Sequence, residues 1–168
     1  MLYNKGVGKR CFQKEEMIMK DTNGIEIKTG DIVEITGAYF KNDNGYWFVD
    51  YSKGDPSWSG NEHSLKKISK SGKISNSRHN ICFWPIMITV NSWEKRAAAK
   101  EWNKEHAKIK VVEGIDKTEM AEYFKTKADA AEAEAERLTY DFGENCETVK
   151  LYKKIKNHYE DVIKRITA

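Results

Sequence analysis

The sequence predicts an α+β protein, in which a small curved antiparallel sheet with one packed helix precedes an antiparallel helical hairpin. Three observations lead to this prediction. Short runs of β-branched and aromatic residues alternate with turn dipeptides in the first half of the chain. An apolar run is followed by a helix start signal at residues 91–94. Beyond residue 116, apolar residues recur every three or four positions, which is helical spacing.

The composition limits the class of protein. The chain has 168 residues and a net charge of +3, and 39% of its residues are hydrophobic. Five Trp, eight Tyr and six Phe exclude wholesale disorder, because a chain without a core does not carry so many aromatic residues. No stretch approaches the roughly 20 apolar residues of a spanning helix, which excludes a membrane protein. The three cysteines are widely spaced and odd in number, as is typical of reduced thiols in the cytoplasm.

Residues 1–18 have basic character and lack the apolar core of a signal peptide. The codons of Lys14, Glu15 and Glu16 form a purine run that resembles a ribosome-binding site, and two further codons separate this run from Met19. One hypothesis is that translation begins at Met19 and that residues 1–18 are a translated leader. The alternative is a short flexible basic arm.

The rest of the chain divides into two parts of opposite charge. Residues 19–112 carry 15 Lys and Arg against 11 Asp and Glu, whereas residues 113–168 carry 10 against 13. We expect the first part to be an α+β domain and the second a helical hairpin. Their opposite charges suggest that they dock on each other or on different partners.

The first strands are predicted from β-branched and aromatic runs. Residues 32–35 suit a half-buried pleated surface. The dipeptide Asn44-Gly45 is a hairpin signal between the aromatic runs 38–40 and 46–51, because both of its residues tolerate a positive φ.

Further strands are expected over residues 65–68, 81–90 and 109–112. The run 81–90 (ICFWPIMITV) is apolar on both faces, as in a central strand, and Pro85 requires a bulge or an edge position within it. Small strands with one packed helix indicate an SH3-like half-barrel.

Three helices are predicted. A capping box from Asn91 to Glu94 opens the first, which ends near residue 107. A second capping box, Asp116 to Glu119, opens a helix with a seam like that of a coiled coil. The seam comprises Phe124, Ala128, Ala131, Ala135, Leu138 and Phe142. The third helix spans about residues 145–166, and its apolar face comprises Val149, Tyr152, Ile155, Tyr159, Val162 and Ile166. The last two helices form the hairpin, which is also a candidate for homo-oligomer formation.

Two features indicate a ligand-binding surface. Residues 65–80 are basic and contain no acidic residue, and aromatic residues gather on or beside the predicted hairpin of strands. Cations attract phosphates, and exposed aromatic rings stack on bases. The candidate ligand-binding residues are Tyr39, Tyr46, Trp47, Trp58, Lys66, Lys67, Lys70, Lys73 and Arg78. They predict a non-enzymatic protein that binds nucleic acid or a nucleotide.

The same residues allow other interpretations. Strand aromatics usually form a core, and a lysine-rich loop is usually only solvated. Trp58 lies in a loop of Gly, Pro and Ser, where it would serve equally well as an anchor for a protein partner. The acidic face of the second helix would fit a basic groove. The alternative function is therefore a protein-binding inhibitor of a host defence or regulatory factor.

Enzyme, cofactor and metal signals are lacking in the sequence. Its four histidines are scattered, and no His or Cys spacing matches a metal site. No P-loop or nucleophile elbow is present. A hydrolase that uses Asp50 or Asp55 is the least favoured alternative, because these carboxylates also fit a strand end and a turn. No catalytic residue, cofactor or metal is predicted.

Three segments carry a resemblance to known proteins: residues 21–33 (DTNGIEIKTGDIV), 83–87 (FWPIM) and 93–107, which begins WEKR and ends WNKEHA. The chain resembles an uncharacterised family of small accessory proteins from phages and plasmids of low-GC Gram-positive bacteria, with an SH3-like N-terminal part. The resemblance covers roughly residues 19–168 and brings no known catalytic residues. It implies an accessory protein of a mobile element, of the kind that binds and blocks a component of the host.

Overall fold

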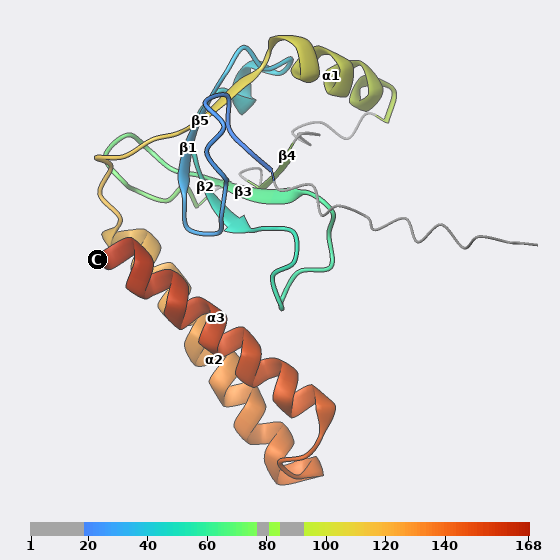
Figure 1. The fold of residues 1–168 in the computed structure, drawn as a ribbon, viewed down its shortest axis with the longest axis vertical. Helices are drawn as coiled ribbons and strands as arrows, with labels where there is room; N and C mark the ends of the chain where they lie inside the picture. The colour runs from blue at the N-terminus through green and yellow to red at the C-terminus, as the bar shows by residue number, and fades with distance from the viewer. Residues whose placement is uncertain (1–18, 77–80, 85–92) are drawn as a thin grey trace, which may run out of the picture.

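The computed structural model describes residues 19–76, 81–84 and 93–168, and it confirms the predicted α+β class. Within these ranges, five antiparallel strands form a curled, SH3-like half-barrel in the order β4-β3-β2-β1-β5 (Figure 1). The strands are β1 (Ile32–Thr36), β2 (Gly45–Tyr51), β3 (His63–Lys67), β4 (Ile81–Trp84) and β5 (Lys108–Val111). A short 3-10 helix, η1 (Lys41–Asp43), precedes β2, and α1 (Trp93–His106) follows β4 in the chain. The predicted leader, residues 1–18, lies outside the described residues.

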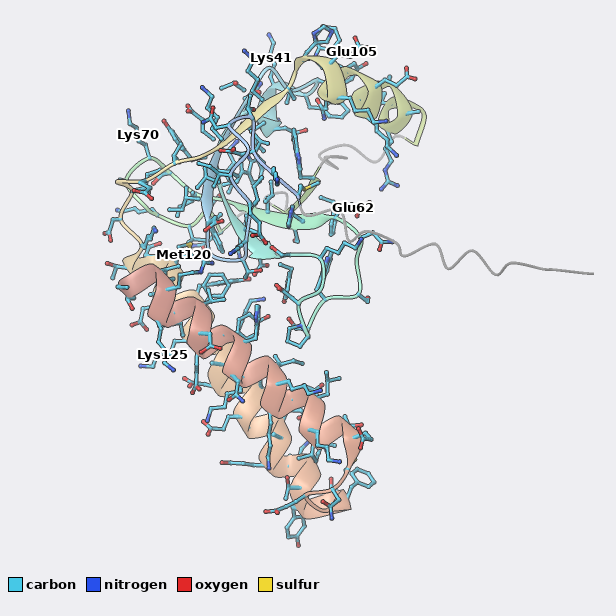
Figure 2. All side chains as sticks on the ribbon, viewed as in Figure 1. Lys41, Glu62, Lys70, Glu105, Met120 and Lys125 are labelled. Carbon is cyan, nitrogen blue, oxygen red and sulfur yellow. The ribbon has the colours of Figure 1, made fainter. Side chains whose placement is uncertain are left out.

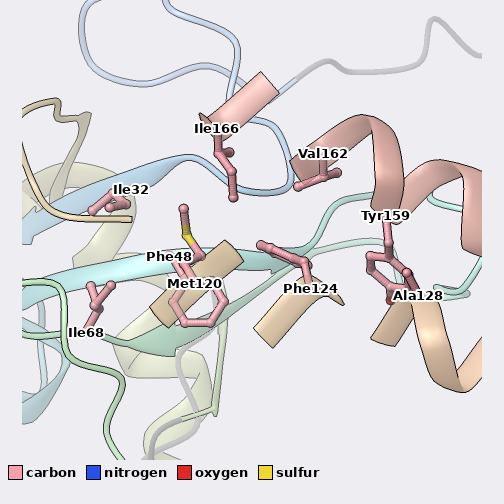
Figure 3. Close-up of a cluster of buried hydrophobic side chains, with 9 residues drawn as sticks. All are labelled: Ile32, Phe48, Ile68, Met120, Phe124, Ala128, Tyr159, Val162 and Ile166. Atoms are coloured by element: carbon pink, nitrogen blue, oxygen red, sulfur yellow. The ribbon is translucent and has the colours of Figure 1, made fainter. Parts of the chain in front are cut away.

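The sheet has a hydrophobic core on each face, because successive residues of a strand point to opposite sides. The barrel interior is filled by Ile27, Val33, Ile35, Trp47, Val49, Leu65, Trp84 and Ile109. The opposite face packs against the hairpin through Ile32, Phe48, Ile68, Met120, Phe124, Ala128, Tyr159, Val162 and Ile166 (Figure 3). The second core therefore joins the two parts of the chain.

The last two helices, α2 (Thr118–Phe142) and α3 (Glu147–Thr167), pack as the predicted hairpin. One end of the hairpin lies against the sheet and the other projects away from it (Figure 1). The predicted seam is buried from Phe124 to Leu138. Phe142 is an exception: it is 68% exposed in the last turn of α2. No helix in the described ranges is long and apolar enough to cross a membrane.

The apolar run at residues 81–84 is an edge strand in the described sheet, and the expectation of a central strand is wrong. Its two faces are covered by different means. Trp84 belongs to the core of the barrel, whereas the ring of Phe83 stacks on Trp58 at a centroid distance of 5.8 Å. Pro85 and the remainder of the predicted strand lie outside the described residues.

The predicted hairpin turn at Asn44-Gly45 is also corrected. β1 pairs with β2 from Ile32 opposite Phe48 to Ile35 opposite Gly45, so residues 38–40 belong to the connecting loop. Asn44 has a φ of −72°, and the positive φ at the start of β2 belongs to Gly45 alone. The loop is long enough to contain η1, so a two-residue turn is not needed.

The predicted capping box at the start of α2 forms only in part. The carboxylate of Asp116 accepts hydrogen bonds from the backbone amide of Thr118 (3.0 Å) and from its hydroxyl (2.7 Å). Glu119 does not reach back, because its carboxylate accepts a hydrogen bond from the backbone amide of Ile74 at 2.8 Å. Glu119 thus connects the β3–β4 loop to the hairpin. The first predicted capping box includes residues outside the described ranges.

Candidate functional site

The structure does not bring the predicted ligand-binding residues together. Trp58 lies in the β2–β3 loop and Lys70 in the β3–β4 loop, and these loops leave opposite ends of β3. Figure 2 shows this separation, since Lys70 and Glu62, a residue of the β2–β3 loop, project from opposite sides of the sheet. Among the described residues, Trp58 and Lys70 therefore do not share one surface.

The two predicted tryptophans offer no free stacking surface. Trp47 is 1% exposed in the core of the barrel, where its indole nitrogen donates a hydrogen bond to the Asp43 carbonyl at 2.8 Å. Trp58 is stacked between Tyr51 and Phe83, with interplanar angles of 11° and 10°. Both faces of the Trp58 ring are covered by aromatic neighbours, so this side chain holds its loop against the sheet.

The predicted basic residues also separate into two groups. Lys67 donates hydrogen bonds to the carbonyls of Asn42 and Asn44 at 2.7 and 2.8 Å, and the ammonium of Lys66 lies 4.6 Å from the ring centroid of Tyr123. These two lysines therefore have intramolecular contacts. Lys70 and Lys73 are exposed in the β3–β4 loop, Tyr46 is half-buried on β2, and Arg78 lies outside the described residues.

Tyr39 belongs to an exposed aromatic group that the sequence did not reveal. The Tyr39 ring meets Trp102 of α1 edge to face at a centroid distance of 6.4 Å, and Trp102 lies 4.1 Å from the ring of His106. Tyr39 is 40% exposed and Trp102 is 46% exposed. We call these three residues, together with the exposed Lys41, Lys104 and Lys108 of the same or adjoining segments, the aromatic–basic patch.

Hydrogen bonds to the β1–β2 loop hold this group in place. The indole nitrogen of Trp102 donates to the carbonyl of Gly37 at 3.0 Å. The side-chain carbonyl of Asn103, which is 2% exposed, accepts a hydrogen bond from the backbone amide of Tyr39 at 3.0 Å. Gly37 has a φ of 71°, and a Cβ atom there would lie 2.5 Å from the carbonyl oxygen of His106. A larger residue at Gly37 would therefore separate the loop from α1.

Three exposed lysines lie on the segments that carry these rings or on segments next to them in the chain. Lys41, Lys104 and Lys108 are all exposed, on η1, α1 and β5 respectively. Figure 2 shows Lys41 at the same end of the molecule as Glu105, which lies on the last turn of α1. Residues 93–111 carry six Lys and Arg against three Glu. The segments that carry the exposed rings are therefore basic overall, although the carboxylate of Glu105 lies 3.7 Å from Nε2 of His106.

The sequence pattern did not reveal this role of α1. A helix packed through its apolar residues was expected, but Ala99 and Asn103 are the buried positions among its described side chains. Trp102 lies three positions from Ala99, at the edge of the buried face, so its indole nitrogen reaches Gly37 while the side chain stays 46% exposed. The weak apolar periodicity of α1 was the one sequence signal that Trp102 need not enter a core.

A cluster of polar side chains, distinct from the aromatic–basic patch, lies where the hairpin meets the sheet. The carboxylate of Asp55 accepts hydrogen bonds from the Thr29 hydroxyl at 2.5 Å and from the Ser52 amide at 2.9 Å, and it lies 3.2 Å from Nε2 of His158 on α3. Burial opposes ionisation, but the nearby His158 and the hydrogen bonds from Ser52 and Thr29 together lower the pKa of Asp55. Burial lowers the pKa of the neighbouring His63, against the attraction of Asp55 and Asp31. No group of three or more His, Cys, Asp or Glu in the described part of the chain is arranged to hold a metal ion.

Comparisons with protein-family models, curated proteins and solved structures give no match for this chain. The resemblance to accessory proteins of phages and plasmids therefore stays a prediction. The fold and the surface define the class of this protein: it is an α+β protein with an SH3-like half-barrel, a docked helical hairpin and an exposed aromatic–basic patch.

Proposed function

We propose that this protein is a non-enzymatic binding protein for single-stranded nucleic acid, and that the aromatic–basic patch is its contact surface. The observation that carries the proposal is the pair of exposed rings, Tyr39 and Trp102, which hydrogen bonds with Gly37 and Asn103 hold on segments that also carry exposed lysines. Proteins that bind single strands without sequence preference combine a basic surface with rings on which bases stack.

The arrangement favours a single strand over a duplex. Stacking on a ring face requires an unpaired base, whereas a duplex presents its phosphates and groove edges. The rings of the patch come from a loop and a helix and meet edge to face, so they present surfaces in different directions. Successive bases of a flexible strand would meet different rings, while lysines of the patch would attract the phosphates.

Fluorescence anisotropy with a labelled single-stranded oligonucleotide tests the proposal. Tyr39→Ala and Trp102→Ala should each weaken binding by about 1–3 kcal/mol, the value of one base stacked on one ring. The triple variant Lys41→Gln, Lys104→Gln, Lys108→Gln should reduce both the affinity and its dependence on salt concentration. Its matched control is the triple variant Lys125→Gln, Lys150→Gln, Lys153→Gln, which changes three exposed lysines of the hairpin.

A further lysine variant, Lys70→Gln with Lys73→Gln, distinguishes binding by the aromatic–basic patch from binding by the exposed β3–β4 loop. Equal loss of affinity in this variant and in the variants of the patch would assign binding to general charge rather than to the patch. Full affinity in Trp102→Ala would overturn the proposal.

A second candidate function, the binding of a partner protein, is favoured by the tip of the hairpin. Tyr140, Phe142 and Leu151 lie near the turn between α2 and α3 and are 93%, 68% and 43% exposed. Exposed apolar side chains that gather in one place mark interaction sites. Sedimentation of the wild type and of Tyr140→Ser, Phe142→Ser tests self-association, which is the simplest form of this function. A wild type that stays monomeric at all concentrations excludes the homo-oligomer.

A further inference from the structure

Aromatic rings surround the ammonium of Lys127 where the hairpin docks on the sheet. The ammonium nitrogen lies 4.1, 5.0 and 5.7 Å from the ring centroids of Tyr51, Tyr123 and Tyr159. A cation within about 6 Å of a ring centroid is attracted by the electron-rich face of the ring. The rings come from β2, α2 and α3 respectively, so this arrangement exists only while the hairpin is docked.

A buried carboxylate completes the arrangement. Oδ1 of Asp50 lies 3.2 Å from the ammonium of Lys127, and the hydroxyl of Tyr51 accepts a hydrogen bond from this ammonium. Burial raises the pKa of Asp50 although Lys127 acts to lower it, so the ion pair does not compensate fully for the burial of the carboxylate. The rings supply the further stabilisation that a buried ammonium requires. We call Asp50 and the tyrosines at positions 51, 123 and 159 the ammonium cage.

Lys127 is the cation that occupies the ammonium cage. The ammonium of Lys66 lies 4.6 Å from the ring centroid of Tyr123, but among the described residues it meets no second ring of the cage. The side chain of Lys127 is 20% exposed, so the cage is open to solvent along this side chain. A shorter residue at position 127 would therefore leave an entrance for a small molecule.

Cages of aromatic rings are a general means by which proteins recognise organic ammonium groups. We propose that the ammonium cage is a binding site for organic ammonium ions, and that Lys127 is its tethered ligand in this chain. A cation in the cage stabilises the docked hairpin, and a free primary amine in its charged form can take the place of the lysine ammonium. The inference uses no residue of the aromatic–basic patch, so its outcome is independent of the proposed function.

Chemical rescue of Lys127→Ala in the full chain tests the proposal. The substitution removes the side chain beyond Cβ, and propylammonium supplies the atoms that are removed. Millimolar propylammonium chloride should raise the melting temperature of this variant, because a ligand that binds only the folded state stabilises it. Propan-1-ol has the same length without the charge. It should bind about tenfold more weakly, as expected when a desolvated interaction between a cation and aromatic rings is lost.

The matched control for this rescue is Lys125→Ala, which changes an exposed lysine of the same helix. Propylammonium should raise its melting temperature no more than sodium chloride of equal concentration does. The wild type should behave in the same way, because Lys127 already fills its cage. Equal effects of propylammonium and propan-1-ol on Lys127→Ala would overturn the proposal, since the cage would then be only an apolar hole. No effect of either compound on the folded variant would also overturn it.

A second test does not depend on the folding of Lys127→Ala. It compares Asp50→Asn with the double variant Asp50→Asn, Lys127→Met. Asp50→Asn removes the buried charge, so a further effect of Lys127→Met reports the contribution of the rings. Methionine keeps the length of the lysine side chain and removes its ammonium, and the double variant should therefore melt at a lower temperature than Asp50→Asn alone. Equal melting temperatures would show that the rings do not bind the cation and would overturn the proposal.

Discussion

The ammonium of Lys127 lies 3.2 Å from Oδ1 of Asp50, and this ion pair connects α2 to β2 beneath the docked hairpin. Asp50 is 4% exposed, and Oδ2 of its carboxylate accepts a hydrogen bond from the Tyr123 hydroxyl at 3.0 Å. Lys127 also donates a hydrogen bond to the Tyr51 hydroxyl, and its ammonium lies 4.1 Å from the centre of that ring. Burial raises the pKa of Asp50 even though Lys127 and Tyr123 act to lower it. Desolvation of this carboxylate therefore outweighs the attraction of its partners.

The two members of this pair should respond differently to substitution. A raised pKa in the folded state means that the protonated carboxyl is favoured by folding, so stability is lost as the pH rises through that pKa. Asp50→Asn should therefore leave the free energy of unfolding at pH 7 unchanged or higher. Lys127→Met should lower it by on the order of 3 kcal/mol, because a buried carboxylate loses its partner. Urea denaturation at pH 7 compares the two variants, and equal losses would contradict the interpretation of Asp50.

Acid should destabilise the protein through His63. Burial lowers the pKa of this imidazole below 6.5, although Asp55 and Asp31 act in the opposite direction. The unfolded chain then binds a proton that the folded chain rejects, so stability is complete above pH 6.5 and falls as the pH drops towards the lower folded pKa. His63→Leu should flatten the dependence of thermal stability on pH between about pH 6.5 and pH 5. An unchanged slope would show that another group is responsible.

The helical hairpin could be predicted from the sequence because its signals are local. Apolar residues at spacings of three and four place Phe124, Ala128 and Ala131 on one face of α2 without any knowledge of the rest of the fold. The docking of this hairpin on the sheet was harder to predict in detail. It depends on Phe48 and Ile32, whose strands also carry apolar residues on the opposite face. Alternation along a strand does not say which partner covers each face.

The two parts dock on each other, which is one of the two outcomes suggested by their opposite charges, but the ion pairs at their junction have the opposite sense. The first part is basic overall and the second acidic, yet acidic residues of the first part meet basic residues of the second at their junction. Lys127 pairs with Asp50, and Arg165 pairs with Asp31 at 2.7 Å. Net charge describes the whole surface of a segment, whereas docking depends on the few groups that become buried.

The candidate site depended on contacts that no sequence pattern shows. Tyr39 and Trp102 are 63 positions apart, and the aromatic runs around Trp47 and Trp58 gave stronger local signals. Core residues cover Trp47, and the rings of Tyr51 and Phe83 cover Trp58. Exposure of an aromatic side chain is a tertiary property, so the sequence could indicate the type of residue but not which ones remain accessible.

Trp58 of the β2–β3 loop and Trp102 of α1 should therefore have separable roles. Trp58→Ala should lower the free energy of unfolding by on the order of 2 kcal/mol, because two stacked ring contacts and their buried area are lost. Its affinity for a single-stranded oligonucleotide should be that of the wild type. Trp102→Ala should show the reverse, with a small change in stability and a loss of affinity. Thermal unfolding and anisotropy on the same two variants check this, and a loss of affinity in Trp58→Ala alone would return the site to the β2–β3 loop.

The alanines of the hairpin seam should resist enlargement. Ala131 is 5% exposed between α2 and α3, whereas Ala133 on the same helix is exposed. Leucine has nearly the helix propensity of alanine, so the substitution changes side-chain volume with little effect on the backbone. Ala131→Leu should lower the free energy of unfolding by about 1–3 kcal/mol, because the extra atoms force the two helices apart. Ala133→Leu should change it by less than about 0.5 kcal/mol, as expected at an exposed position. If Ala131→Leu were as stable as Ala133→Leu, the hairpin would have room at its seam, and close packing of α2 on α3 would not be what holds the two helices together.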